Sequence, residues 1–397
     1  MKKYYLFIAL CLLITSCATE KSVQTDATPI YLQEMTKVKT IPFGDERFFR
    51  KCSVINLELS EESIIGKISQ IEFFNNYIYI LDQKTNTLKV FDMLGNYVQS
   101  IGKRGNGPGE FLAINTFYIN EQNRTINLFD PLKQAVMRYD LFGKYIESIK
   151  FPDPVLGLIS RATCFGKDKV FCFTNPNWLV NSGYFIIDEN DYTIIEKIYQ
   201  YPFEMEKQMA FMLMTHPYSM YNDDLLFVSL FSNTITLYAN GEKEPLFQVE
   251  NKLLPADNEY VKKLAKENDE DYLKIIRKML DDKKYTVGLK NIFETEQYIC
   301  VDFYGKNLLS EAILWDKKAN LGYHIEDYYT NSSADFGSIV TCFDNTLVKI
   351  LKDNDISYLK EQMENNENKT KYPDEILNSI EKHEDGDNPI LLLYEFK

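Results

Sequence analysis

The side chains that most often carry out chemistry are widely spaced in this sequence of 397 residues. The three histidines, His216, His324 and His383, lie far apart, and none has the spacing of an H-E-x-x-H zinc motif. No G-x-S-x-G nucleophile elbow is present. Acidic residues are plentiful, so a carboxylate pair or a calcium site stays open as an alternative. The sequence therefore identifies no catalytic, cofactor-binding or metal-binding residue.

One glycine-rich stretch, "IGKRGNGPGEF" at 101–111, invites comparison with a phosphate-binding loop. Such a loop needs G-x-x-x-x-G-K-[ST] between a strand and a helix. No Lys-Ser or Lys-Thr follows here, and the next segment resembles a strand. We therefore interpret the stretch as a connection between two strands, in which Pro108 fixes a turn and Phe111 packs into the next unit.

The seven cysteines favour neither a disulfide framework nor a zinc site. Cys11 and Cys17 belong to the N-terminal region, and five others follow: Cys52, Cys164, Cys172, Cys300 and Cys342. Five is an odd number, and no C-x-x-C spacing occurs. Several of them stand in strand-like runs, so we expect buried thiols that pack as small hydrophobic groups.

The N-terminus has the pattern of an export signal. Lys2 and Lys3 precede the apolar run "YYLFIALCLLIT", which ends in "ITSC" at 14–17. This ending resembles the bacterial lipobox, which implies a lipid on Cys17; the alternative is a secretory signal with a chance cysteine. We expect residues 1–17 to be a lipoprotein signal peptide with its lipobox and residues 18–50 to be a tether. The predicted location is the bacterial cell envelope, either periplasmic or surface-exposed.

The net charge of the chain bears on its partners. The formal charge is −14, and no local basic patch stands out in the sequence. An acidic surface repels the phosphate backbone. We therefore expect no nucleic-acid partner.

An internal repeat indicates the architecture. "YIYILDQKTNTLKVFDMLGNYVQSI" at 77–101 matches "TINLFDPLKQAVMRYDLFGKYIESI" at 125–149. A constant offset of 48 joins Asp82 to Asp130, Asp92 to Asp140 and Gly95 to Gly143. Looser copies of the pattern occur at 184–198, 225–249 and 298–325. Several short strands in each unit of this length predict a β-propeller.

We predict an all-β, six-bladed β-propeller over residues 51–397. Strand-like runs near 338–352 would supply the first two strands of blade 6, and 388–397 the third. Residues 52–59 would supply the fourth, so that strands from near both ends close the ring and leave no unpaired blade edge.

The stretch G-x-x-G-x-G-P-G-E-F, followed by "INLFD" and "VMRYDLFGKYIESI", resembles the NHL-type repeat. With "ITSC" and the ending "DNPILLLYEFK", the chain is similar to six-bladed propeller lipoproteins of Bacteroidetes over roughly residues 50–397. Blades 1 and 2 carry the resemblance most clearly. It implies a fold and an exported location, and it implies no reaction.

The alternating direction of the strands places the long connections on one face of the propeller. Helical insertions at 257–282 and 356–385 fall on that face, where we expect a ligand. Arg104, Trp178 and Tyr304 are the candidate ligand residues there. Arg104 suits a carboxylate or phosphate, and Trp178 or Tyr304 suits stacking on a sugar or peptide. Their structural alternatives are a solvated cation and aromatic rings packed under their own loops.

We favour a non-catalytic binding or scaffold module, held at the membrane by its N-terminal lipid. Its partner would be a peptide, a glycan or another envelope protein. No cofactor is expected. The alternative is a lyase or hydrolase with side chains converging on the central channel, with or without bound calcium.

Overall fold

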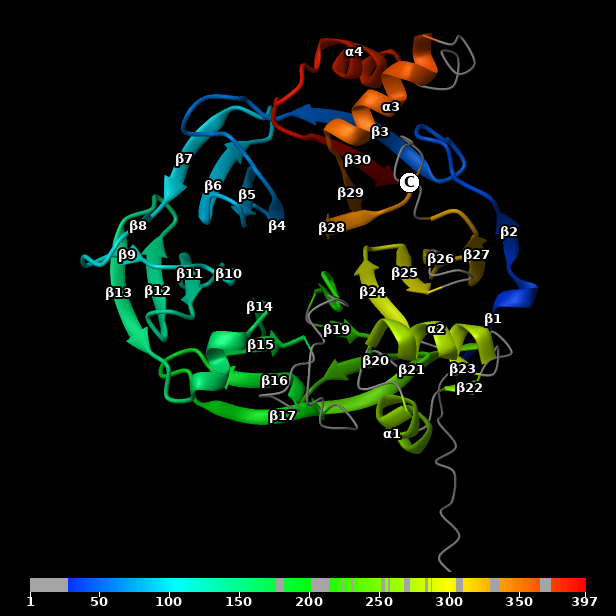
Figure 1. The fold of residues 1–397 in the computed structure, drawn as a ribbon, viewed down its shortest axis with the longest axis horizontal. Helices are drawn as coiled ribbons and strands as arrows, with labels where there is room; N and C mark the ends of the chain where they lie inside the picture. The colour runs from blue at the N-terminus through cyan, green and yellow to red at the C-terminus, as the bar shows by residue number, and fades with distance from the viewer. Residues whose placement is uncertain are drawn as a thin grey trace, which may run out of the picture.

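The structure is a computed structural model, and it describes most of the chain after residue 27. The described residues are 28–175, 182–200, 214–222, 224–229, 232–250, 254–255, 258–267, 272–282, 285–286, 288–304, 310–328, 336–364 and 373–397. Six sheets stand around a central axis as the blades of a propeller (Figure 1). The expected fold class, an all-β six-bladed propeller with helical insertions, is confirmed.

Each blade has four antiparallel strands, called a to d from the channel outwards. Blade 1 contains β4 (Ile68–Phe74), β5 (Tyr77–Asp82), β6 (Thr87–Asp92) and β7 (Tyr97–Ile101). Blade 2 contains β10 (Thr116–Asn120), β11 (Thr125–Asp130), β12 (Ala135–Asp140) and β13 (Tyr145–Lys150). Blade 3 contains β14 (Arg161–Cys164), β15 (Lys169–Phe173), β16 (Ser182–Asp188) and β17 (Ile194–Gln200).

The other three blades repeat this order. Blade 4 contains β18 (Tyr218–Tyr221), β19 (Asp224–Phe227), β20 (Thr234–Ala239) and β21 (Glu242–Glu250). Blade 5 contains β24 (Leu289–Glu294), β25 (Tyr298–Tyr304), β26 (Ser310–Asp316) and β27 (Leu321–Ile325). Blade 6 contains β28 (Ile339–Phe343), β29 (Thr346–Leu351), β30 (Ile390–Phe396) and β3 (Phe49–Asn56). Blade 6 thus joins a strand from near the N-terminus to one from near the C-terminus.

The repeated aspartates hold the turns of blades 1 and 2. The Asp82 carboxylate accepts hydrogen bonds from the backbone N–H groups of Gly66 and Lys67, at 3.0 and 2.7 Å. Asp130 accepts one from Leu112 at 2.7 Å, so each carboxylate secures the connection that leads into its blade. Charge-assisted bonds of this kind explain why the same residue recurs at the same place in the unit.

The core consists of apolar layers between neighbouring blades. Phe111 and Phe117 are fully buried between blades 1 and 2. Phe73 of β4 stacks on Phe343 of β28, with ring centroids 4.1 Å apart, and so packs blade 6 against blade 1. Burial of these aromatic side chains is the main force that holds the blades together.

The segment expected as a tether, 18–50, is attached to the propeller from residue 28 onward. β1 (Thr28–Tyr31) pairs in parallel with β21 of blade 4, and β2 (Thr36–Val38) pairs in parallel with β27 of blade 5. Phe43 and Phe48 are buried against blades 5 and 6. From residue 28 the expected tether therefore runs along the outer strands, where its apolar side chains and backbone groups find partners. Residues 18–27 lie outside the described residues.

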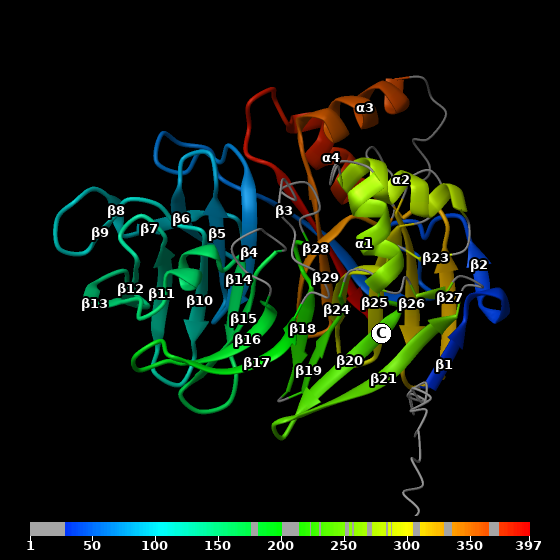
Figure 2. The same cartoon turned by 60° about the horizontal axis from the view of Figure 1, so that its bottom comes forward.

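The two faces of the propeller differ. The helices α1 (Asn258–Glu267) and α2 (Tyr272–Asp282) connect blade 4 to blade 5, and α3 (Asp353–Glu364) and α4 (Asp374–Lys382) connect two strands of blade 6. Figure 2 shows both pairs on one side of the ring, here called the insertion face. The opposite side, called the short-turn face, carries the a-to-b and c-to-d turns. None of the helices in the described part of the chain has the length and apolar character needed to cross a bilayer.

Candidate functional site

Of the three candidate ligand residues, the structure describes the side chain of Arg104 alone. Arg104 lies exposed in the short strand β8 (Lys103–Arg104), on the connection from blade 1 to blade 2. Tyr304 ends β25, and its backbone pairs with Ser310; its side chain is outside the description. Trp178 and the expected lipid site Cys17 both lie outside the described residues.

The glycine-rich connection at 101–111 is held together by its own residues. Lys103 forms an ion pair with Glu110 at 2.9 Å, and the same carboxylate accepts a hydrogen bond from the Gly107 N–H at 2.8 Å. A Cβ atom at Gly105 would overlap this carboxylate, which explains the glycine. The Glu110 carboxylate therefore occupies the centre of this loop. In a phosphate-binding loop, the bound phosphate would take this position.

A cavity of about 190 Å³ lies in the central channel. Its lining comes from the innermost strands of blades 1, 2, 3, 4 and 6. The innermost strands run from the insertion face to the short-turn face, and the lining residues Phe74, Glu121 and Met220 stand at or next to their ends. Glu121 and Met220 are exposed. The cavity therefore occupies the short-turn half of the channel, opposite to the face where we expected a ligand.

Glu72 and Arg161 form an ion pair in this cavity. The Arg161 Nη2 donates to Glu72 Oε1 at 2.8 Å, and Gln70 Nε2 donates to the same oxygen at 3.1 Å. Both bonds reach Oε1, so Glu72 Oε2 accepts no hydrogen bond from the described residues. The Arg161 Nη1 donates to the Thr215 carbonyl at 3.2 Å. The guanidinium is thereby fixed in orientation, while the carboxylate keeps one acceptor available to a ligand.

Two buried side chains adjoin Arg161. Its guanidinium carbon lies 5.7 Å from the centre of the Tyr218 ring, a cation–π contact. The Tyr218 hydroxyl is buried and has no hydrogen bond of normal geometry within the described residues. Burial raises the pKa of Tyr218 well above its usual value, with Arg161 opposing the shift, so the hydroxyl stays protonated.

His216 is held as a neutral ring. Its Nδ1 lies 2.8 Å from the carbonyl oxygen of Ile292. A carbonyl only accepts, so Nδ1 carries the proton and Nε2 is an acceptor. Burial lowers the pKa of His216 well below 6.5, and the nearby Arg161 charge adds to this effect. Asn291 fixes the backbone here by accepting from the His216 N–H at 2.8 Å.

The cysteine of the cavity is a protonated thiol. Burial raises the pKa of Cys342 to about 11. Its Sγ lies 3.6 Å from the carbonyl oxygen of Glu294 and 3.6 Å from Ser219 Oγ. A thiol in this state is a poor nucleophile. Within the part of the chain that the structure describes, no three His, Cys, Asp or Glu side chains gather closely enough to hold a metal ion.

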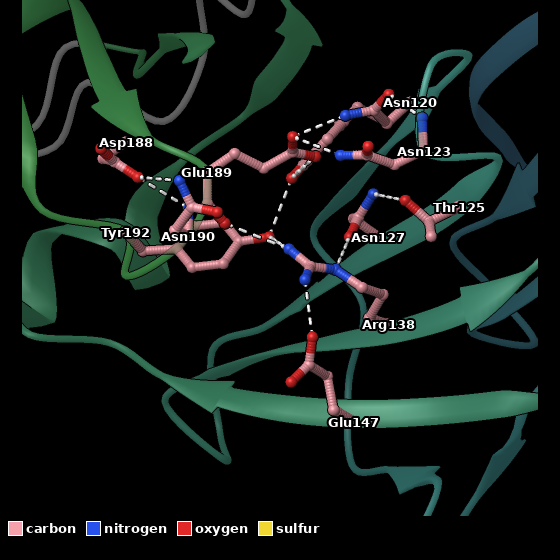
Figure 3. Close-up of polar contacts among 11 residues, drawn as sticks. Asn120, Asn123, Thr125, Asn127, Arg138, Glu147, Asp188, Glu189, Asn190 and Tyr192 are labelled. Carbon is pink, nitrogen blue, oxygen red and sulfur yellow. Dashed lines mark hydrogen bonds and ion pairs between the residues drawn. The ribbon is translucent and has the colours of Figure 1, made fainter. Parts of the chain in front are cut away.

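A second polar cluster joins blades 2 and 3 (Figure 3). It adjoins the cavity through Tyr118. The Glu189 carboxylate accepts hydrogen bonds from Tyr118 at 3.1 Å, Asn120 at 2.5 Å and Asn123 at 3.3 Å. Arg138 donates to the Glu189 carbonyl at 3.1 Å and pairs with Glu147 at 2.6 Å. Since both carboxylate oxygens of Glu189 already have donors, this cluster serves to join the blades.

Sequence reasoning missed Glu72, Arg161, His216 and Tyr218 as a group. A usable signal existed for Glu72, which is the only charged residue in the strand-like run "ISQIEFF". A charge in an innermost strand must find a partner across the channel. The partner could not be named, because the register of the first strand in blades 3 and 4 is not fixed by the repeat.

The comparisons with known proteins concern the fold. A family model described as a domain of unknown function, DUF4934, matches residues 30–395. Comparison with curated proteins gave no match. A solved structure from Bacteroides fragilis, described as an exported protein, is 19% identical with a TM-score of 0.73 and covers 93% of this chain and 100% of its own. A DUF4221 family member from Bacteroides vulgatus is 12% identical with a TM-score of 0.52 and covers 88% and 97%. At these identities the likeness shows a shared fold.

Proposed function

Because this chain belongs to the DUF4934 family, a domain of unknown function, we propose its function from the geometry of its central cavity. It is a non-catalytic binding propeller of the bacterial cell envelope, anchored through a lipid on Cys17. The cavity holds a small uncharged polar group that belongs to a peptide or a glycan.

The Glu72–Arg161 pair carries this proposal. Its two charges compensate one another, so a charged ligand would bring an unpaired charge next to the buried Arg161 side chain, which is costly. An uncharged group that both donates and accepts fits better, because Glu72 Oε2 accepts and the Arg161 guanidinium donates. The volume of about 190 Å³ is below that of typical drug-sized sites, which suits one residue or one sugar ring rather than a large ligand.

The protonation states in the cavity favour binding over catalysis. Catalytic groups are usually tuned so that an acid, base or nucleophile is ready near neutral pH. Here the Cys342 thiol has a pKa of about 11, and the pKa of His216 is lowered well below its usual value. The competing proposal of a lyase or hydrolase, with calcium as a cofactor, would need side chains beyond those that line the described cavity.

The envelope location is supported by three separate observations. The sequence "ITSC" at 14–17 has the pattern of a lipobox, and the NHL-like cadence of blades 1 and 2 resembles that of exported propeller lipoproteins. The Bacteroides fragilis structure with the same fold is described as exported. Nucleic acid is not among the proposed partners, since the chain is acidic.

Thermal unfolding of the lipid-free mature protein, with Cys17→Ser, tests the proposal. Neutral sugars, dipeptides and envelope glycan fragments are titrated, and binding to the folded state raises the midpoint by mass action. Glu72→Gln should abolish the shift. Glu147→Gln is the matched control, because Glu147 also pairs with an arginine and lies outside the cavity.

The outcomes separate the two functions. A shift by a sugar or dipeptide that is lost in Glu72→Gln supports the binding module. A calcium-dependent rise in the midpoint, abolished by a chelator, would instead favour the enzyme. A shift that survives in Glu72→Gln would place the ligand elsewhere and refute the cavity as its site.

A further inference from the structure

Exposed apolar side chains concentrate on the short-turn face. Among the described residues, eight large hydrophobic side chains are exposed at this end of their strands or turns: Tyr77, Leu94, Val98, Phe142, Ile146, Ile195, Met220 and Leu321. Five others lie elsewhere: Tyr31, Leu59, Ile64, Leu132 and Tyr358. Leu94 and Phe142 are the most exposed, at 81% and 80% of their surface. An end of the molecule that carries many exposed apolar groups is a candidate interaction surface.

Leu94 and Phe142 occupy the same position in two successive repeats. Each stands in a c-to-d turn, where the carboxylate of Asp92 or Asp140 accepts a hydrogen bond from its backbone N–H at 2.9 Å. Gly95 and Gly143 follow with positive φ, as this tight turn requires. The turn fixes the backbone so that the apolar side chain stands in solvent. Nothing in the fold of either blade uses these two side chains.

The position and direction of β1 limit where the lipid anchor can lie. β1 is parallel to β21, and β21 begins directly after a c-to-d turn of the short-turn face. Thr28, which pairs with Phe247, is therefore the end of β1 that lies nearer to that face. Ten residues, 18–27, separate Thr28 from Cys17. Ten residues can span at most about 35 Å, which is enough for a lipid on Cys17 to lie at this face.

We propose that the short-turn face docks on the lipid bilayer, with Leu94 and Phe142 inserted into the interface. This inference rests on the lipid anchor of the proposed function. β1, the first described element, lies on blade 4, while the apolar turns belong to blades 1 and 2, on the other side of the ring (Figure 1). Contacts on both sides of the ring hold the face parallel to the membrane. Stable attachment commonly combines a lipid with a second, protein-borne signal.

Docking in this orientation also determines which molecules can reach the cavity. The cavity lies in the short-turn half of the channel, with Glu121 and Met220 at its rim. It would face the headgroup layer of the membrane. A sugar or peptide attached to a membrane component could then reach it, whereas the two helix pairs would point away from the bilayer.

Tryptophan reporters test the docking. Leu94→Trp and Phe142→Trp are introduced into the lipidated full-length protein, which is reconstituted on vesicles of phosphatidylethanolamine and phosphatidylglycerol with brominated acyl chains. Leu132→Trp is the matched control, since Leu132 is 66% exposed in a b-to-c turn of the insertion face. The wild-type protein, whose tryptophans are Trp178 and Trp315, gives the background fluorescence and its quenching. Replacement of such exposed residues should leave the fold intact.

We expect the brominated lipid to quench the emission at positions 94 and 142 and to leave position 132 unchanged. An anchored protein whose position 132 is quenched as much as 94 and 142 overturns the docking and leaves the proposed function standing. A wild-type protein that stays in the aqueous phase without detergent, as its Cys17→Ser variant does, overturns the lipid anchor and the docking together.

Discussion

At the scale of single residues, Glu72 and Arg161 in the central cavity stabilise each other's charge. Arg161 is buried, whereas the Glu72 side chain is 31% exposed. Water therefore weakens the attraction between them, and the hydrogen bonds from Gln70 and to Thr215 supply part of the stabilisation. If one residue of the pair is replaced, the charge of the other stays shielded from water and is no longer neutralised.

Replacement of Arg161 tests this dependence. Arg161→Met should lower the free energy of unfolding by about 1–3 kcal/mol, because Glu72 is left half-buried without its cation. Urea unfolding measures the loss. The double variant Arg161→Met, Glu72→Gln should recover part of it, since no unpaired charge remains. Equal stability of Arg161→Met and the wild type would show that the pair contributes nothing.

His216 makes stability depend on pH. Its pKa is well below 6.5 in the folded protein and near 6.5 in the unfolded chain. Below pH 6.5 only the unfolded chain takes up this proton, so stability is complete above pH 6.5 and falls as the pH drops. The loss amounts to about 1.4 kcal/mol for each pH unit. Urea unfolding between pH 7.5 and 5.5 should give a smaller pH dependence for His216→Gln; an unchanged slope would refute this role.

Some residues of the structure could be predicted and others could not. Asp82 and Asp130 follow from the repeat, and Phe111 from its place before a strand, because these roles depend on local turns. Arg161 and Tyr218 depend on which side chains meet across a channel, which is set by five blades together. The expected ligand face was inferred from the length of the connections, whereas the described cavity depends on side-chain volumes at the other end.

At the scale of elements, the strands that repeat every 48 residues were recognisable, and the N-terminal strands were not. β1 and β2 have four and three residues, too few to show an alternating pattern. They exist because the outer strands of blades 4 and 5 offer unpaired backbone groups. Burial of Ile30 in β1 adds an apolar anchor to these hydrogen bonds.

Ile30→Asp should detach β1 while the propeller stays folded. A buried charge without a partner is costly, and β1 pairs only along the edge of blade 4. Hydrogen exchange should become faster in β21, whose partner is lost, and stay unchanged in β7 of blade 1. Faster exchange in both strands would show that the N-terminal segment supports the whole ring.

At the scale of the whole molecule, ring closure depends on blade 6. β30 lies between β29 and β3 and bonds to both, so it joins the two ends of the ring. Leu391, Leu392 and Tyr394 of this strand are fully buried. Strand-like patterns near both ends of the sequence made this closure predictable, although the pairing itself spans almost the entire chain.

Deletion of residues 390–397 should abolish cooperative unfolding and expose the apolar layers between blades. Deletion of residues 28–39, which removes β1 and β2, should leave a cooperative transition at a lower midpoint. Circular dichroism during heating distinguishes the two. A cooperative transition in the first variant would show that five blades suffice for a stable propeller.

The pairing of β3 with β30 also determines how early the ring can close during synthesis. Arg50 in β3 forms an ion pair with Glu395 in β30, and the two stand 345 positions apart. At roughly 5–20 residues per second, the early strand waits for tens of seconds or more before its partner is made. The ring stays open for that whole period. In the proposed envelope location the chain crosses a membrane before it folds, and this delay would favour export, because β30, the strand that closes the ring, is among the last to be made.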